Sequence, residues 1–115
     1  MGLAKKIGMA ILPVRDLDAA ERFYREALGL EAKFRDGERF AALELGGVTV
    51  ALAAGEEDRA GATALSFKVD DVAAAVHALC EAGATVAREV EEGPHERRAV
   101  LRDPAGNPFI VYASR

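Results

Sequence analysis

The sequence predicts an α+β domain of two strand–helix–strand–strand–strand modules, whose helices cover one face of a curved mixed sheet and leave the other concave. Three observations support this prediction. Apolar residues alternate along several short segments, as in half-buried strands, and recur at helical spacing in two longer ones. A pair of glycines joins two of the strands. The same order of elements occurs twice, since VRDLDAA from Val14 matches VDDVAAA from Val69.

Residues 40–53, FAALELGGVTVALA, predict a hairpin that turns on Gly46 and Gly47, because paired glycines tolerate the positive φ of a tight turn. This register places large apolar side chains on the face that a helix covers: Leu43, Leu45, Val48, Val50 and Leu52. The opposite face is small and of mixed polarity: Phe40, Ala42, Glu44, Thr49, Ala51 and Ala53. We expect this second face to line a cleft.

The other strands of the first module precede the hairpin. Residues 6–14 are apolar and rich in strand formers, and Pro13 marks the end of this first strand. Residues 31–35 predict a short strand, which Asp36 and Gly37 turn back into the hairpin.

The segment RDLDAAERFYREALGL between these strands predicts a helix that ends at Gly29. Its N-cap is either Asp18, which has Glu21 at capping-box spacing, or Asp16. The apolar stripe of this helix consists of Leu17, Ala20, Tyr24, Ala27 and Leu28.

The polar segment at residues 55–61, GEEDRAG, predicts the joint between a first module of about residues 1–56 and a second of about residues 62–115. In the second module, residues 63–69 alternate as a strand. One side carries Leu65, Phe67 and Val69, and the other carries Ala64, Ser66 and Lys68.

A helix capped by Asp70 or Asp71 follows and ends at Gly83. Its stripe consists of Val72, Val76, Leu79 and Cys80, so Cys80 is expected to be a small buried side chain. Residues 85–90, 97–102 and 108–112 predict the remaining strands, the last two joined by the turn DPAGN.

Composition limits the classes of partner. A chain of 115 residues is one domain, and its net charge of −4 with a pI near 5.2 argues against nucleic acid as the main partner. No apolar run approaches the length of a membrane span, and the N-terminus lacks a signal-peptide pattern. The single cysteine fits a reducing compartment, so we expect a cytoplasmic protein without a membrane partner.

Several motifs together resemble one family over nearly the whole chain. They are the opening I-x-x-A-I-L-P-V-R-D-L-D-A-A, the run FYREALGL, the helix start VDDV, and DPAGNP followed by FIVY. In order and spacing they resemble the vicinal oxygen chelate superfamily of glyoxalases, bleomycin-resistance proteins and ring-cleaving dioxygenases. The resemblance implies a cleft formed by two curved sheets, and a homodimer. In the family's enzymes it also implies a divalent metal held by four side chains, two per module.

The corresponding four positions in this chain are Met9, Ala51, Ala64 and Ile110. None of these side chains offers the hard oxygen or imidazole nitrogen that Mg, Mn, Fe, Ni or Zn ions prefer, and a lone thioether is a poor ligand for them. A shift of one residue in either direction brings no better donor. The sequence therefore predicts no metal site of the family type and no cofactor.

A few polar residues remain as candidates. Glu44 is either an acceptor for a cationic or hydroxylated ligand, a general base, or a strand-end carboxylate in solvent. Lys68 either meets an anionic ligand, pairs with Glu44 or extends to the rim, and Ser66 beside it is small. His95 lies in the loop GPHER and either contacts ligand or is a surface residue.

Three arginines and the second histidine complete the inventory. Arg97, Arg98 and Arg102 either neutralise an anion or form a solvated strand edge with nearby glutamates. His77 is expected to face solvent. No residue is assigned a catalytic role.

The leading hypothesis is a metal-free member of the superfamily that binds a small, partly apolar molecule in its cleft, as antibiotic-sequestering resistance proteins do. The expected ligand-binding residues are Met9, Ile11, Phe40, Glu44, Thr49, Ala51, Ala64, Ser66, Lys68, His95, Ile110 and Tyr112. One alternative is a glyoxalase-type lyase, isomerase or dioxygenase that uses Glu44 and His95 as atypical metal ligands. Another is a structural or regulatory dimer module whose own side chains fill the cleft.

Overall fold

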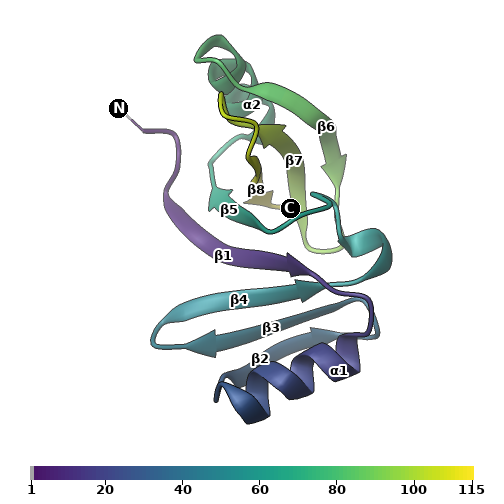
Figure 1. The fold of residues 1–115 in the computed structure, drawn as a ribbon. Helices are drawn as coiled ribbons and strands as arrows, with labels where there is room; N and C mark the ends of the chain where they lie inside the picture. Colours follow the sequence, from purple (N-terminus) through teal and green to yellow (C-terminus); the bar gives the residue numbers. More distant parts are fainter. Residues whose placement is uncertain (1) are drawn as a thin grey trace. The chain divides into compact units, whose positions relative to one another are not determined.

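The computed structural model describes residues 2–115, and within them it contains eight strands and two α-helices (Figure 1). The first half consists of β1 (Lys6–Pro13), α1 (Leu17–Arg22), the π-helical turn η1 (Phe23–Ala27), β2 (Glu31–Asp36), β3 (Phe40–Leu45), β4 (Val48–Ala53) and the 3-10 turn η2 (Gly55–Glu57). The second half consists of β5 (Ala64–Lys68), α2 (Val72–Glu81), β6 (Thr85–Glu92), β7 (Glu96–Arg102) and β8 (Pro108–Ser114). This order confirms the predicted α+β class and its repeated plan.

The chain forms two compact units. The first unit is Met9–Thr63. The second is Ala64–Arg115 together with the residues up to Gly8, so the start of β1 belongs to the second unit. The predicted joint at residues 55–61 lies within the first unit, in and beyond η2. No helix within residues 2–115 is long and apolar enough to cross a membrane.

The sheet of the first unit has the strand order β2-β3-β4-β1. Strand β3 is antiparallel to both neighbours, and β1 is parallel to β4. Glu44 pairs with Thr49, as the predicted turn requires. Gly46 and Gly47 have φ values of 60° and 83°, in the left-handed region that favours glycine, so the turn itself fixes this register.

Helix α1 begins at Asp16, whose carboxylate accepts a hydrogen bond from the backbone N–H of Ala19 at 3.1 Å. Asp16 is therefore the N-cap, and Asp18 lies in the first turn of the helix. The α-helical geometry ends at Arg22 and passes into η1. The whole helical segment stops before Gly29, which has a φ of 86°.

The π-helical turn changes which side chains of this segment are buried. Each turn of a π-helix holds more residues than an α-helical turn, so the predicted stripe does not continue through η1. Leu17 and Tyr24 pack in the core as predicted, but Ala27 and Leu28 are exposed. Leu30, immediately before β2, is buried in their place.

The core of the first unit lies between α1 and one face of the sheet. Its buried residues are Leu17, Leu30, Ala41, Leu43 and Leu52, against which Leu12, Val14, Ala20, Tyr24 and Val50 pack. The prediction that Leu43 and Leu52 face the helix is confirmed. For Leu45 and Val48 it is wrong, because these side chains are 54% and 59% exposed. Both flank the glycine turn at the end of the hairpin and lie outside the cluster that packs on α1.

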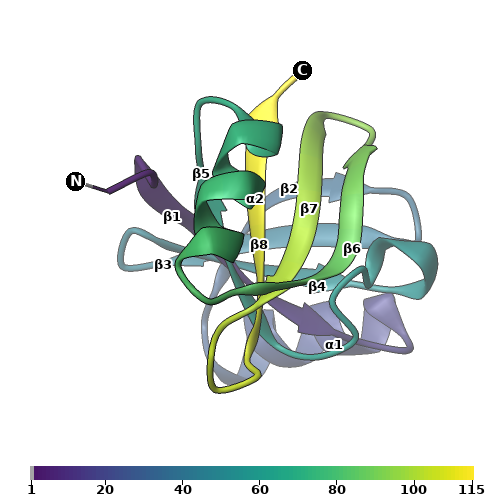
Figure 2. The same cartoon turned by 90° about the horizontal axis from the view of Figure 1, so that it is seen from above.

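The sheet of the second unit has the order β5-β8-β7-β6, with β5 parallel to β8 and the other pairs antiparallel. Helix α2 packs against β6, β7 and β8 (Figure 2). Asp71, not Asp70, is its N-cap and accepts from the backbone N–H of Ala74 at 3.1 Å. The buried core consists of Val69, Val72, Ala75, Ala99, Leu101 and Val111. Cys80 is exposed rather than buried, because Ala75, Val76 and Leu79 form the packed side of the helix.

The turn between β7 and β8 is held by Asp103. One carboxylate oxygen accepts from the backbone N–H groups of Ala105 at 2.9 Å and Asn107 at 2.8 Å. The other accepts from the Asn107 side chain at 3.1 Å, and this hydrogen bond is the main reason that the pKa of Asp103 is lowered. The predicted turn DPAGN is thus confirmed, with the carboxylate of Asp103 as its centre.

Replacing Leu43 with alanine tests the placement of the first core. Leu43 is fully buried, so Leu43→Ala should lower the free energy of unfolding by about 2–5 kcal/mol through lost burial and a residual cavity. Leu45→Ala is the matched control on the same strand and face, and its exposed side chain predicts a loss below about 1 kcal/mol. Urea denaturation measures both. Equal losses would contradict the described core.

Candidate functional site

Each sheet has a second face, directed away from its helix, which we call the distal face. Side chains alternate along a strand, so residues between the core positions lie on this face. In the first unit it carries Met9, Ile11, Phe40, Ala42, Glu44, Thr49 and Ala51. In the second unit it carries Ala64, Ser66, Lys68, Arg98, Val100, Ile110 and Tyr112. All of the predicted ligand-binding residues except His95 therefore lie on a distal face.

The predicted residues differ in how much surface they offer to a ligand. Ala51, Ala64, Ser66 and Ile110 are buried, and even the polar Ser66 is only 2% exposed. Met9, Ile11, Phe40, Glu44, Thr49, Lys68 and Tyr112 are half-buried. His95 is exposed in the turn between β6 and β7. Of the predicted residues on the distal faces, the half-buried set therefore offers most of the accessible surface.

The centre of the first distal face is a row of four side chains across four strands. In the middle, Ala42 of β3 pairs with Ala51 of β4. Phe34 of β2 pairs with Ala42, and Ile11 of β1 pairs with Ala51. Two large apolar side chains are thus separated by two methyl groups.

Phe34 is a distal-face residue that sequence reasoning missed. A bulge in β2 between Ala32 and Phe34 shifts the pairing of β2 with β3 by one residue. Counting alternate residues along β2 from the Asp36–Gly37 turn does not reveal this shift. The ring of Phe34 is 46% exposed, and its centroid lies 6.5 Å from that of Phe40 at an angle of 56°. Two aromatic rings therefore lie together on this face.

Glu44 is the half-buried acid of the first distal face, and the exposed Glu31 on β2 pairs directly with it. It is half-buried and pairs across the hairpin with Thr49, whose hydroxyl accepts a hydrogen bond from the Lys33 ammonium at 3.1 Å. Within residues 2–115, no side chain forms an ion pair or hydrogen bond with the Glu44 carboxylate. This carboxylate is therefore available to a ligand.

A polar row crosses the distal face of the second unit. Lys68 pairs with Tyr112, Tyr112 pairs with Arg98, and Arg98 pairs with Glu91. Over the part of the chain that the structure describes, no carboxylate is ion-paired with Lys68, whose side chain is half-buried. Its ammonium is the available cation of this row.

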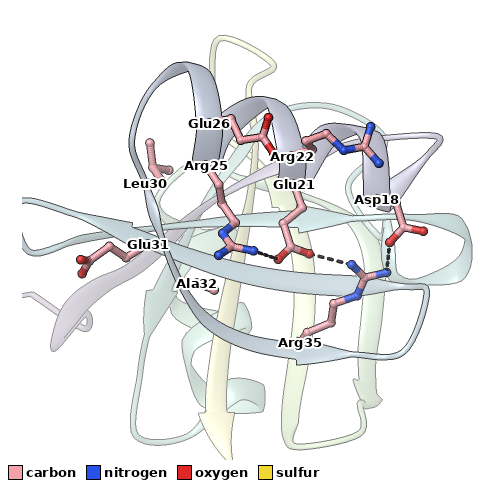
Figure 3. Close-up of a pocket in the computed structure, with 9 residues that line it drawn as sticks. All are labelled: Asp18, Glu21, Arg22, Arg25, Glu26, Leu30, Glu31, Ala32 and Arg35. Carbon is pink, nitrogen blue, oxygen red and sulfur yellow. Dashed lines mark hydrogen bonds and ion pairs between the residues drawn. The ribbon is translucent and has the colours of Figure 1, made fainter.

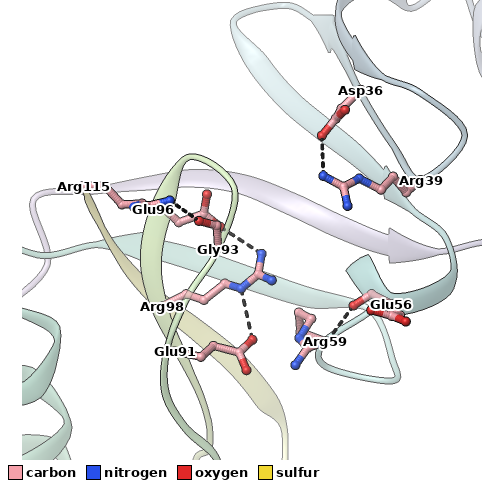
Figure 4. Close-up of polar contacts among 9 residues, drawn as sticks. All are labelled: Asp36, Arg39, Glu56, Arg59, Glu91, Gly93, Glu96, Arg98 and Arg115. Atoms are coloured by element: carbon pink, nitrogen blue, oxygen red, sulfur yellow. Dashed lines mark hydrogen bonds and ion pairs between the residues drawn. The ribbon is translucent and has the colours of Figure 1, made fainter.

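Arg98 is buried and already neutralised (Figure 4). It is 9% exposed, and its guanidinium lies 3.1 Å from Glu91 and 3.1 Å from Glu96. A Cβ at Gly93 would approach the guanidinium carbon to 2.9 Å, so the guanidinium lies directly against this glycine. Arg97, by contrast, is exposed and pairs with Glu92 at 2.6 Å. The predicted pairing with nearby glutamates is thus observed for both arginines, but Arg98 does not belong to a solvated edge.

Tyr112 adds a neutral hydroxyl to the same row. A Cβ at Gly8 would collide with this phenol oxygen, so the ring end lies directly against the Gly8 backbone. Burial, with a smaller effect from the charge of Glu96, raises the pKa of Tyr112. The side chain therefore serves as a hydrogen-bonding phenol and is a poor general base near neutral pH.

The residues at the four family metal positions do not fit a divalent ion. Ala51, Ala64 and Ile110 are buried hydrocarbon side chains, and Met9 offers a thioether alone. Across residues 2–115, no group of three or more His, Cys, Asp or Glu side chains is placed to hold a metal.

A groove of about 730 Å³ lies on the other side of the first unit, between the α1–η1 segment and β2 (Figure 3). Its lining residues are Asp18, Glu21, Arg22, Arg25, Glu26, Leu30, Glu31, Ala32 and Arg35. Arg35 pairs with Asp18 and Glu21, each at 2.7 Å, and these contacts raise its pKa. Glu21 also lies 3.6 Å from Arg25. These ion pairs join the helix to the edge strand, which is a structural role.

Replacing Arg98 with methionine tests its buried ion pairs. Arg98→Met leaves Glu91 and Glu96 partly buried without their shared cation, so the free energy of unfolding should fall by about 3–5 kcal/mol at neutral pH. Arg97→Met, next in the chain, removes an exposed pair and should cost about 1 kcal/mol or less. Chemical denaturation measures both. A small loss for Arg98→Met would show that its charge is solvated.

Fold and site positions together define a protein of the vicinal oxygen chelate type. The chain belongs to the glyoxalase-like domain family, whose model matches residues 9–112. An uncharacterized protein of Mycolicibacterium smegmatis is 38% identical over 109 residues, which cover 94% of this chain and 93% of the relative.

Two solved structures show the same fold. Methylmalonyl-CoA epimerase from Mycobacterium tuberculosis has a TM-score of 0.72 at 20% identity, covering all of this chain (100%) and 91% of that one. A glyoxalase/bleomycin resistance protein/dioxygenase superfamily member from Vibrio splendidus 12B01 has a TM-score of 0.67 at 20% identity, covering 93% and 97%. At this identity the likeness concerns the fold alone and confirms the architecture.

Proposed function

We propose that this chain binds a small, partly apolar molecule on the distal faces of its sheets, without a metal ion and without reaction, as bleomycin-resistance-type sequestering proteins do. The homodimer expected from the family is part of the same proposal. The observation that carries it is the contrast between two sets of residues. The family metal positions carry hydrocarbon and thioether side chains, whereas the half-buried residues of each distal face combine apolar surface with one charge, Glu44 or Lys68, that has no ion-pair partner within residues 2–115.

The half-buried apolar residues support an apolar ligand body. Met9 and Ile11 on β1 and Phe40 on β3 share one distal face, and all three keep part of their surface accessible. Pockets for small molecules are mostly apolar, with a few polar groups that fix orientation. Glu44 is suited to the orienting role on this face, and Lys68 to the same role on the distal face of the second unit, since neither is ion-paired within residues 2–115.

The titratable groups support binding over acid–base catalysis. The raised pKa of Tyr112 keeps it a phenol, and Arg98 is already paired with two carboxylates. His77 is exposed on α2 beside Glu81, at 3.6 Å, as expected for a surface residue. His95 is exposed on a loop. Neither histidine is buried on a distal face, where a general acid or base would have to reach a bound ligand.

A thermal-shift screen with small amphipathic molecules, run in EDTA, tests the proposal. We expect at least one compound to raise the melting temperature saturably and to be recovered unchanged. Phe40→Ala should weaken that compound about tenfold or more, because burying a phenylalanine side chain contributes about 1.5–3 kcal/mol. Phe23→Ala is the matched control, since Phe23 is 55% exposed in η1.

Two outcomes would overturn the proposal. Binding only after a divalent ion is added, or conversion of the compound to a product, would favour a metal-dependent enzyme with Glu44 and His95 as the first ligands to replace. No stabilisation by any compound across a broad panel would favour a structural or regulatory module.

A further inference from the structure

We infer that the distal face of the first unit selects an amphipathic amine, whose protonated nitrogen lies between the Glu44 carboxylate and the ring of Phe34, with the ring of Phe40 farther along the same face. This inference rests on the proposed binding function and specifies its ligand class. It uses contacts within Met9–Thr63 only.

The first support is the state of the Glu44 carboxylate. A partly desolvated carboxylate is costly unless a cation or hydrogen-bond donors compensate it. Glu44 is half-buried and lacks such a partner within residues 2–115. The neighbouring cation, Lys33, donates instead to the Thr49 hydroxyl at 3.1 Å and forms no ion pair with Glu44. A ligand cation would supply the missing compensation.

The second support is the ring of Phe34, the aromatic side chain nearest to this carboxylate across the strands. Phe34 pairs with Ala42, two residues from Glu44 on the same face of β3, and such diagonal neighbours lie roughly 7–8 Å apart. A cation is attracted to an aromatic face within about 6 Å of the ring centroid. The Phe34 and Phe40 rings are tilted by 56°, so they present differently directed faces. One nitrogen can therefore contact the Glu44 carboxylate and the nearer ring, that of Phe34.

The third support is the surrounding apolar surface. Ile11 and Phe40 are half-buried on the same distal face, with only Ala42 and Ala51 between Ile11 and Phe34. The apolar body of a ligand can lie along these side chains while its nitrogen meets Glu44. An anionic group at the same place would be repelled by the carboxylate, which gives selectivity by charge.

Three compounds with one apolar body test the inference: 4-phenylbutylamine, 4-phenylbutanol and 4-phenylbutanoate. Isothermal titration calorimetry at neutral pH should show the amine binding about tenfold tighter than the alcohol, and the carboxylate weakest. Glu44→Gln should abolish the preference for the amine while leaving the alcohol's affinity within about twofold. Glu26→Gln makes the same charge change on η1, at the helix side of the unit, and should leave the preference intact.

The outcomes separate this inference from the proposed function. Equal or tighter binding of the alcohol or carboxylate would overturn the amine selectivity but leave the binding function standing. An amine preference that survives Glu44→Gln would overturn the assigned site. If none of the three compounds binds at millimolar concentration, the inference fails, and the broader screen with Phe40→Ala decides the function separately.

Discussion

The pairing of Glu44 with Thr49 across the β3–β4 hairpin is the constraint on which the first unit depends. The Gly46–Gly47 turn fixes this pairing, and the strand period of two then assigns every other side chain to a face. A slip of one residue would remove Leu43 from the core and place Glu44 under α1, where an unpaired carboxylate costs several kcal/mol. The same constraint that builds the core therefore keeps a carboxylate on the distal face.

The two units share the same order of elements, but the charged side chains on their distal faces differ in how far they are ion-paired. In the second unit, Arg98 is enclosed and shared between Glu91 and Glu96, so most of the polar row is satisfied by the protein itself. In the first unit, Glu44 has no such partner within residues 2–115. Because a buried group with its own partners has little to offer a ligand, we expect recognition to depend on Glu44 and Lys68 more than on the arginines.

The side chains at the family's metal positions explain why ligand recognition would depend on Glu44 and Lys68 instead of on a metal ion. A divalent ion would be the largest local charge in such a site and would dominate how a ligand is held. With Ala51, Ala64 and Ile110 buried as hydrocarbon and Met9 as a thioether, that role is not supported by these four side chains. In the proposed function, the polar half-buried residues orient the ligand and apolar contact area provides most of its affinity.

Features set by local chemistry were predictable from the sequence. The glycine turn gave the hairpin register, DPAGN gave the β7–β8 turn, and aspartates marked both helix starts, although the choice between neighbouring aspartates needed the structure. Features set by pairing or packing were not predictable. The bulge before Phe34 and the π-helical turn η1 change register without a local signal, and the burial of Arg98 depends on strands folding beside it.

Metal content tests the central claim most directly. The protein should be purified without a metal-affinity tag, analysed for elements, and then titrated with Mg, Mn, Fe, Ni and Zn ions while its melting temperature is followed. The account predicts no stoichiometric metal and no saturable stabilisation by any of these ions. One tightly held ion per chain would contradict it.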